Sequence, residues 1–341
     1  MMARKIASRA INSREVILAQ SRIIAAAVLT AATVVAPPPL MAQTFPSKTI
    51  HLVVPYAAGG TGDIVARVVA DRLAIALGQS VVVENRPGAS GALGSKAVAS
   101  AAPDGHTLLV GQTGEMAINQ HWAKNLGYDP EKDLAPVALA TVVPLALVIP
   151  GKATYSTVAE MLQTAKTRPL AFASAGTATP GHFAGEVLKL KTNSNMTHVP
   201  YNGAGPALND LLGGHVDLFF SGFPAAVPHV KAGNLKLIAV SSGRRSATAP
   251  DVPTVAEASG ITGFDITLWQ GFFAPRGTPS EIVTRLNTEI NRILVEPDVK
   301  ARLLDAGADV MPIAVDQFAV FVQAESAKFL QIINDANLKP E

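Results

Sequence analysis

A glycine-rich turn between an apolar strand and an amphipathic helix constrains the fold of this chain more than any other feature. The strand ends at Val53–Tyr56, the turn covers Ala57–Gly62, and the helix is predicted from Asp63 to Leu77. Such a junction brings unpaired backbone N–H groups and the positive end of a helix dipole to one point, which suits an anion. A second junction of this kind, Leu170–His182, follows about 120 residues later. The pair predicts one small anion held between two lobes.

The first 42 residues are typical of a cleaved export signal. Five basic residues, from Arg4 to Arg22, precede an uncharged run of 14 residues from Ile23 to Ala36. That run is short for a membrane span and matches the apolar core of a signal peptide. We expect cleavage near Ala42 and a periplasmic location, with a membrane anchor as the alternative.

Charge and composition exclude several classes of function. The chain has 28 basic and 26 acidic residues; five and one of these lie in the first 42, which leaves 23 and 25 and a net charge of −2. The basic isoelectric point therefore comes from the leader and implies no nucleic-acid partner. Cysteine is absent from the sequence, which excludes disulfides and thiolate chemistry. The seven histidines lack zinc-ligand spacing, so we expect no metal and no other cofactor.

Two blocks of alternating strands and helices predict an α/β fold with two lobes. In the first block, the strands Thr49–Tyr56, Val81–Asn85 and Thr107–Gly111 are rich in valine and leucine, as in parallel sheets covered on both faces. The alternation restarts and extends over Thr157–Ser241, and we expect only helices over Ser280–Asn337. Each lobe is therefore predicted to be a mainly parallel sheet flanked by helices.

Two long extended segments, Ala135–Ile149 and Phe264–Ala274, are expected to cross between the lobes at a hinge. The first lobe would then comprise residues 43–143 and 266–341, and the second lobe residues 144–265. Two crossovers make a hinge with a cleft, and ligands of parallel sheets lie beyond the carboxyl ends of the strands. Trp269, in the second crossover, belongs either to the hinge core, which we favour, or to the cleft wall.

The Gly59–Gly62 loop lacks the features of nucleotide-binding loops. Val65 stands where the third glycine of the dinucleotide fingerprint belongs, and no lysine follows the loop as in phosphate-binding loops. A plain structural turn is the alternative to anion contact. Asp63 is expected mainly to cap the helix or complement its dipole, and secondarily to touch a ligand.

The second loop offers neutral hydrogen-bond donors. Ser174, Thr177 and Thr179 supply hydroxyl groups beside backbone amides, and neutral donors bind a carboxylate without the cost of burying an arginine. His182, at the start of the following helix, is either a cleft donor or a helix-surface residue. Two further strand–loop–helix junctions begin at Tyr201 and Ser221, and each either closes over the ligand or is a simple turn.

Seven short motifs occur through the chain in a characteristic order and spacing. They are Pro46–Ile50, Val54–Gly60 with Asp63, Val82–Ala89, Ala102–Gly105, Ser174–Thr177, His198–Tyr201 and Phe273–Pro275. With these motifs the chain resembles the Bug family, the extracytoplasmic substrate-binding proteins of tripartite tricarboxylate transporters. The resemblance implies a two-lobed, flytrap-like fold of the periplasmic-binding-protein type that closes on a carboxylate.

The resemblance also implies where the ligand binds. Members of the family hold one carboxylate between the two glycine loops, partly through ordered water. The corresponding residues here are Tyr56, Ala57, Ala58, Gly59, Gly60, Thr61, Asp63, Ser174, Ala175, Gly176, Thr177 and Thr179. His182, Tyr201 and Ser221 complete the candidate ligand-binding set. The family often has an acidic residue where Ser221 stands, so its absence weakly favours a ligand without an amino group.

We therefore expect a monomeric, non-enzymatic binder that delivers a small organic carboxylate to membrane transporter subunits. A ligand-sensing partner of a membrane signalling protein is the alternative, because it would use the same cleft. An exported hydrolase ranks third, since Ser174 does not lie in a G-x-S-x-G elbow and no acid and histidine follow in triad order. The sequence does not identify the carboxylate.

Overall fold

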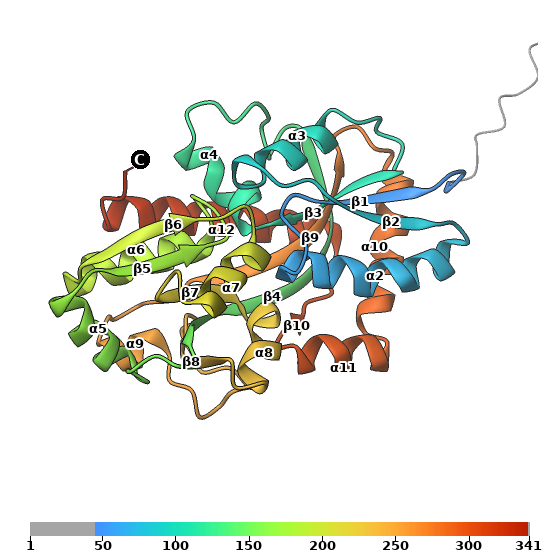
Figure 1. The fold of residues 1–341 in the computed structure, drawn as a ribbon. Helices are drawn as coiled ribbons and strands as arrows, with labels where there is room; N and C mark the ends of the chain where they lie inside the picture. The colour runs from blue at the N-terminus through green and yellow to red at the C-terminus, as the bar shows by residue number, and fades with distance from the viewer. Residues whose placement is uncertain (1–44, 340–341) are drawn as a thin grey trace, which may run out of the picture. The chain divides into compact units, whose positions relative to one another are not determined.

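An array of ten strands flanked by helices makes up residues 45–339, which are the residues described by the computed structural model (Figure 1). The expected signal peptide lies outside these residues. The strands are ordered β2-β1-β3-β9-β4-β7-β5-β6, and β8 and β10 also pair with β4. Their bounds are β1 Ile50–Val54, β2 Val81–Asn85, β3 Thr107–Gln112, β4 Leu134–Pro150, β5 Leu170–Ser174, β6 Met196–Pro200, β7 Leu218–Gly222, β8 Leu235–Val240, β9 Thr267–Pro275 and β10 Asp309–Val310.

The helices follow the predicted alternation along the chain. Their bounds are α2 Thr61–Leu77, α3 Ala92–Ala99, α4 Asn119–Trp122, α5 Val158–Thr167, α6 Pro180–Thr192, α7 Ala204–Gly213, α8 Phe223–Lys231, α9 Val255–Ser259, α10 Ser280–Leu294, α11 Pro297–Asp305 and α12 Val315–Asp335. A 3-10 turn, Ala89–Gly91, precedes α3, and a π-helical turn, Gly114–Ile118, precedes α4. The sequence did not predict α4, α9, either of these turns or the two-residue strand β10, which corrects the expectation that only helices follow β9. These segments are too short to show a periodic pattern.

Parallel pairing between strands is confined to two units, and β8, which was expected to belong to the second, instead pairs antiparallel with β4. β1 is parallel to β2 and β3, and β5 is parallel to β6 and β7. Every antiparallel pair involves β4 or β9. The α/β, two-lobed fold class is therefore confirmed, with antiparallel pairs introduced only by the two long strands.

β4 and β9 are the two extended segments that join the lobes, and they lie side by side (Figure 1). β4 pairs with β9 from Leu134 to Pro144 and with β7 or β8 from Leu145 to Pro150. Below, the first lobe means β1–β3, β9 and β10 with α2–α4 and α10–α12, and the second lobe means β5–β8 with α5–α9. The predicted limit between residues 143 and 144 falls inside β4, and the exact lobe limits stay a prediction.

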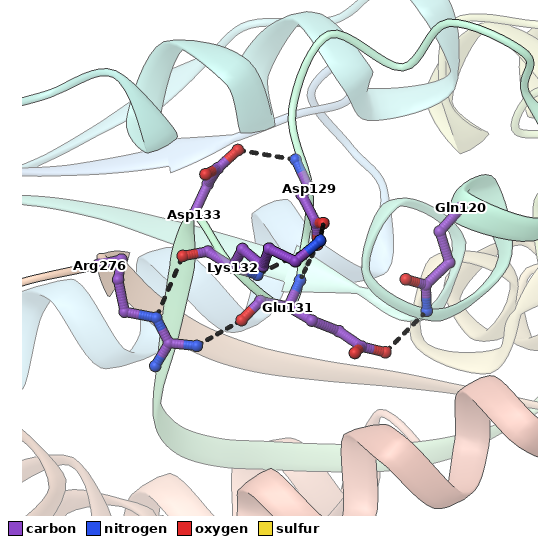
Figure 2. A network of polar contacts seen from close by, with 6 residues as sticks. All are labelled: Gln120, Asp129, Glu131, Lys132, Asp133 and Arg276. Carbon is purple, nitrogen blue, oxygen red and sulfur yellow. Dashed lines mark hydrogen bonds and ion pairs between the residues drawn. The ribbon is translucent and has the colours of Figure 1, made fainter.

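A polar network fastens β4 and β9 to each other at one end (Figure 2). The Arg276 guanidinium, just after β9, donates hydrogen bonds to the carbonyl oxygens of Glu131 and Lys132, just before β4. The Arg276 backbone N–H donates to the Asp133 carbonyl oxygen at 2.8 Å. The Asp133 side chain in turn accepts the Asp129 N–H at 2.7 Å, which closes the loop. β4 therefore begins, and β9 ends, at the same hydrogen-bonded network.

Aromatic side chains fill the core around the crossovers and between the lobes. Trp269 of β9 is fully buried against Phe273, Phe318 and Phe321, which places it in the hinge core as favoured. Phe183 of α6, in the second lobe, is also fully buried. Its ring meets Trp122 of the first lobe at 5.2 Å. Burial of each such side chain contributes roughly 1.5–3 kcal/mol, so these aromatic contacts stabilise the hinge.

Candidate functional site

The first glycine loop, Tyr56–Asp63, is held in shape by one carboxylate. Gly59 has a φ of 85°, and its N–H donates to Asp63 Oδ2 at 3.1 Å. Asp63 Oδ1 accepts hydrogen bonds from Arg67 Nη2 at 2.9 Å and from Asn85 Nδ2 at 3.1 Å. Burial opposes the charge of Asp63, but these hydrogen bonds together lower the pKa of its carboxyl group. Asp63 therefore braces the loop with both of its oxygens engaged by the protein.

The second glycine loop, Ser174–Pro180, is shaped by hydroxyl groups. Ser174 Oγ donates to the Gly176 carbonyl oxygen at 2.9 Å, and Thr179 Oγ1 donates to the same oxygen at 2.7 Å. The Gly176 φ of 147° is available only to glycine, so the chain can turn sharply here. Pro180 then begins α6 at a position where a missing N–H costs nothing.

Both loops line one cavity of about 40 Å³ between the lobes. The first loop contributes Tyr56, Ala57, Gly60, Thr61 and Asp63 of the predicted set, and the second contributes Ala175 and Thr179. The cavity wall does not include eight other predicted residues: Ala58, Gly59, Ser174, Gly176, Thr177, His182, Tyr201 and Ser221. In this closed arrangement the cavity has room for only a few water molecules.

The predicted residues outside the cavity wall have other surroundings. Gly176, Thr177 and Tyr201 border a separate groove of about 400 Å³ that also includes Ala89 and Ser90 of the first lobe. The hydroxyl group of Tyr201 donates to Asp210 Oδ2 at 2.6 Å. Ser221 Oγ is fully buried in β7 and donates to the Gly222 carbonyl oxygen.

His182 is buried inside the second lobe. Its Nδ1 accepts the Ala178 N–H at 3.2 Å, and its ring stacks on the His198 ring with centroids 4.2 Å apart. Trp122 of the first lobe covers the outer edge of His182 at 5.6 Å. Burial, with the neighbouring His198 and Lys189, lowers the pKa of His182 to about 3. This residue is neutral at physiological pH and supports the second loop from behind.

Ser174 and His198 lie at the distance expected of a nucleophile and its base, yet the pair is structural. Ser174 Oγ is 2.7 Å from His198 Nε2. Ser174 is fully buried, and its hydroxyl group is already bonded to Gly176. His198 Nδ1 has no hydrogen-bond partner, so no carboxylate orients the ring as a triad requires.

Four helices of the described residues begin at the cavity. Gly60–Asp63 start α2, Thr179–Gly181 start α6, Ala204 starts α7, and Gly222 precedes α8. The first N–H groups of a helix have no partner within it, and the helix dipole places about half a positive charge there. The cavity wall includes no lysine, arginine or histidine. The carboxylate of Asp63 in the wall is paired with Arg67, so the main-chain dipoles are the feature that favours an anion here.

Several residues of the cavity wall were not predicted. Gln112 is the last residue of β3, and Gly114 follows two residues later. A Cβ at Gly62 would come within 2.8 Å of Gln112 Nε2. The larger apolar residues of the wall that were not predicted are Val54, Leu145, Phe219, Phe220 and Leu268. Thr61 Oγ1 is buried at this wall without a hydrogen-bond partner. The unpaired hydroxyl group of Thr61 and the side-chain amide of Gln112 therefore line the same cavity as the helix N-termini.

Direct contacts hold the two lobes together around the cavity. The Ala57 N–H donates to the Asn202 carbonyl oxygen at 2.9 Å. A Cβ added at Gly205 would collide with the Ala58 carbonyl oxygen, and one added at Gly176 would come within 3.0 Å of Ser90 Oγ. Glycines thus permit the close approach of backbone from both lobes.

The described residues also bear on metals and membranes. Between residues 45 and 339, no group of three or more histidine, cysteine, aspartate or glutamate side chains could hold a metal ion. Within the same range, none of the helices combines the length and the apolar character that a bilayer span requires.

Comparison with known proteins gives a consistent result. The model of a family described as the tripartite tricarboxylate transporter family receptor matches residues 65–338. The protein BugT of Bordetella pertussis is 35% identical over 304 residues, which cover 88% of this chain and 93% of BugT. An adipate-bound protein of R. palustris has a TM-score of 0.84 and 35% identity, covering 87% of this chain and all of its own. MatC of Rhodopseudomonas palustris, with bound malate, has a TM-score of 0.81 and 37% identity, covering 85% of this chain and all of MatC.

Proposed function

Because the chain belongs to the tripartite tricarboxylate transporter receptor family of solute-binding proteins, which are not enzymes, we propose that it captures a small organic carboxylate between its lobes and delivers it to membrane transporter subunits. The convergence of four helix N-termini on one interlobe cavity carries this proposal. Because that positive potential comes from both lobes, an anion bound there stabilises the closed form over the open form.

The strength of such a site is adequate for a receptor. A hydrogen bond to a charged group contributes about 1.5–3 kcal/mol. Four or five of them, less the cost of ordering the ligand and the loops, give about −8 kcal/mol, which corresponds to micromolar affinity. The exposed amides and the unpaired hydroxyl group of Thr61 are the candidate donors, with water bridging where the distance is long.

The rest of the cavity wall narrows the ligand class. The side-chain amide of Gln112 can pair with a second polar group, and the apolar residues Phe219, Phe220 and Leu268 suit a short carbon skeleton. The adipate and malate bound to the two relatives are dicarboxylates. One carboxylate of such a ligand would lie at the helix N-termini, and the other would lie near Gln112 and the apolar residues. Malate and adipate are therefore the first ligands to test here.

Ligand entry requires the lobes to separate. A cavity of about 40 Å³ is too small for a dicarboxylate of four or six carbons. Because β4 and β9 are the two connections between the lobes, opening by rotation about these strands would expose all four helix ends at once. The ligand would then be enclosed on closure, in a periplasmic location that the leader sequence supports.

Calorimetry on the mature protein tests the proposal. We expect at least one of malate, adipate, succinate and benzoate to bind with micromolar affinity. Gly60→Ala should weaken that binding, because the new methyl group enters the cavity without close contacts to the protein. Gly243→Ala, at an exposed site with ordinary contacts, is the matched control. No heat of binding or thermal shift with any member of a broad carboxylate panel would contradict the function.

Delivery needs a separate experiment. Deletion of the coding sequence should abolish uptake of the identified ligand by cells, and expression of the intact chain should restore it. If uptake persisted while a ligand-dependent transcriptional response disappeared, the receptor would serve signalling instead of transport.

A further inference from the structure

Glu115 is a fully buried carboxyl group beside the ligand cavity that the proposed function leaves unused. It lies in the π-helical turn Gly114–Ile118, directly after the cavity residue Gly114. Its Oε1 accepts the Gln112 backbone N–H at 2.5 Å, and its Oε2 lies 2.8 Å from the Tyr56 hydroxyl oxygen. Both of these partners, Gln112 and Tyr56, also line the cavity.

The hydrogen bonds around Glu115 can hold one more proton than an ionised carboxylate provides. The Tyr56 hydroxyl group has one proton but two acceptors in reach, Glu115 Oε2 at 2.8 Å and the Ser90 carbonyl oxygen at 3.2 Å. If Oε2 carries a proton, it donates to the Tyr56 oxygen and frees the phenolic proton for Ser90. A neutral Glu115 therefore lets Tyr56 and Asn119 both donate to the Ser90 carbonyl oxygen, and no buried group of this network is left without a partner.

The surroundings of Glu115 also disfavour a negative charge. The titratable groups that face it are Tyr56 and Tyr128, and the Tyr128 hydroxyl group donates at 2.7 Å to the Glu115 carbonyl oxygen. In the described part of the chain, Glu115 has no lysine, arginine or histidine as an ion-pair partner. Burial raises the pKa of Glu115 to about 8, against the smaller lowering effect of its hydrogen bonds.

The same chain of hydrogen bonds ends at a turn that contacts the second lobe. Ser90 belongs to the turn Ala89–Gly91, where Ala89 and Ser90 have φ values of 47° and 52° that few non-glycine residues adopt. Tyr56 and Asn119 hold this strained turn through the Ser90 carbonyl oxygen. The Ser90 side chain in turn lies against Gly176 of the second glycine loop. The protonation state of Glu115 thus bears on both the cavity wall and the contact between the lobes.

We propose that Glu115 is a positioning residue that holds Tyr56, the Gln112–Gly114 segment and the Ser90 turn as a neutral acid, so that capture of an anionic ligand is linked to one proton on Oε2. The inference rests on the proposed carboxylate-binding function. Loss of that proton would draw the Tyr56 hydroxyl group away from Ser90. It would also place the negative charge of Glu115 next to the anionic ligand. Both effects weaken the closed, ligand-bound form.

Calorimetry with malate or adipate from pH 6 to 9.5 tests the link. The dissociation constant should stay constant up to about pH 7.5 and then rise about tenfold by pH 9.5. Glu115→Gln keeps the shape but cannot ionise, so its affinity should not change over this range. Glu186→Gln, another buried glutamate paired with Lys189, is the control and should follow the unmodified protein. A flat profile for the unmodified protein, or a Glu115→Gln profile that rises in parallel with it, would overturn the inference.

The unmodified protein provides a second measurement if Glu115→Gln does not fold. Titrations at pH 8.5 in two buffers of different ionisation enthalpy give the number of protons taken up with the ligand. We expect net uptake of about half a proton, because the carboxyl is already partly protonated at this pH, and no uptake would refute the link.

A ligand-free measurement separates this inference from the proposed function. Because the carboxyl pKa is raised on folding, its protonated form stabilises the native state, and that stability is lost as the pH rises from 4.5 through about 8. The unfolding midpoint of Glu115→Gln relative to the unmodified protein should therefore increase over this range. If this occurs but no carboxylate binds, the proposed function fails and the neutral acid remains. If carboxylates bind and both pH profiles are flat, the function remains and the proton link fails.

Discussion

The backbone N–H of Ala57 donates a 2.9 Å hydrogen bond to the carbonyl oxygen of Asn202, which joins the first glycine loop to the loop before α7. One main-chain donor of the first loop is thus used to hold the lobes together, whereas the helix N-termini beside it remain directed at the cavity. The glycines at this seam, such as Gly203 and Gly205, leave room for the opposite backbone. Lobe closure and ligand binding therefore depend on the same few residues.

Gly205→Ala should impair closure of the lobes without impairing folding. Gly205 lies inside α7, where alanine is favoured over glycine by up to about 1 kcal/mol, so the second lobe should fold at least as stably as before. The new Cβ would collide with the Ala58 carbonyl oxygen of the first lobe, so closure should be impaired. We expect at least tenfold weaker ligand binding by calorimetry, with no loss in the free energy of urea unfolding.

Gly213→Ala is the matched control for that experiment. Gly213 is the last residue of the same helix, and a Cβ there would meet only the movable His215 side chain of its own lobe. Its affinity for the ligand should stay unchanged. Equal affinities of the two variants would show that the seam at Ala58 does not control closure.

Thr61→Val should raise stability and lower affinity. Thr61 Oγ1 is buried without a partner, and such a group costs about 1–3 kcal/mol in the ligand-free protein. Valine has a similar shape, so the free energy of unfolding should increase by about 1 kcal/mol. If the hydroxyl group donates to the carboxylate, binding should weaken roughly tenfold, which corresponds to about 1.4 kcal/mol. Unchanged affinity would remove Thr61 from the ligand contacts. Thr288→Val, on an exposed helix face, is the control.

Acid should destabilise the protein through its stacked histidines. Burial is the main cause that lowers the pKa of His182 to about 3 and that of His198 to about 4, from an ordinary value near 6.5. A histidine with a lowered pKa stabilises the native state fully above pH 6.5 and loses that contribution as the pH falls towards the folded value. For one such group the loss is about 2 kcal/mol between pH 6.5 and 5.

His182→Asn tests this origin of acid sensitivity. The asparagine oxygen can accept the Ala178 N–H in place of His182 Nδ1, but it does not titrate. Urea unfolding at pH 7 and pH 5 should therefore show about half the pH dependence of the unmodified protein, because His198 still titrates. An unchanged pH dependence would assign the acid sensitivity to other groups.

The sequence predicted the elements that have strong local patterns. The two glycine loops, the parallel units and the crossovers β4 and β9 were predicted because each depends on hydrophobic runs and turn residues within a short segment. Gln112 and Gly114 were missed because nothing local marks them. Their signal was topological: the predicted strand over residues 107–111 ends at the same sheet edge as β1, so the residues after it face the same cleft.

The sequence pattern could not predict which side chains are buried by contacts between the lobes. His182 was assigned either to the cleft or to the helix surface, and its covering by Trp122 depends on how the first lobe meets α6. The neutral pairing of Tyr56 with Glu115 likewise depends on a π-helical turn that brings residues 59 positions apart into contact. Contacts of this kind follow from tertiary packing and leave no periodic trace in the sequence.

Asp63→Asn should destabilise the first loop, because both carboxylate oxygens hold it through hydrogen bonds. The substitution removes a charge that Arg67 pairs with at 2.9 Å, so the free energy of unfolding should fall by about 1.5–3 kcal/mol at pH 7. The pKa of Asp63 is lowered on folding, so its contribution is present above pH 3.8 and is lost as the pH falls through the folded value. Urea unfolding should therefore show a stability difference between the two proteins that is constant from pH 6 to 8 and shrinks below about pH 4.

Asp71→Asn, at an exposed position of the same helix, is the control and should change the free energy of unfolding by less than about 0.5 kcal/mol. A difference that persists unchanged at pH 3 would mean that the loop is held by the shape of Asp63 and not by its charge.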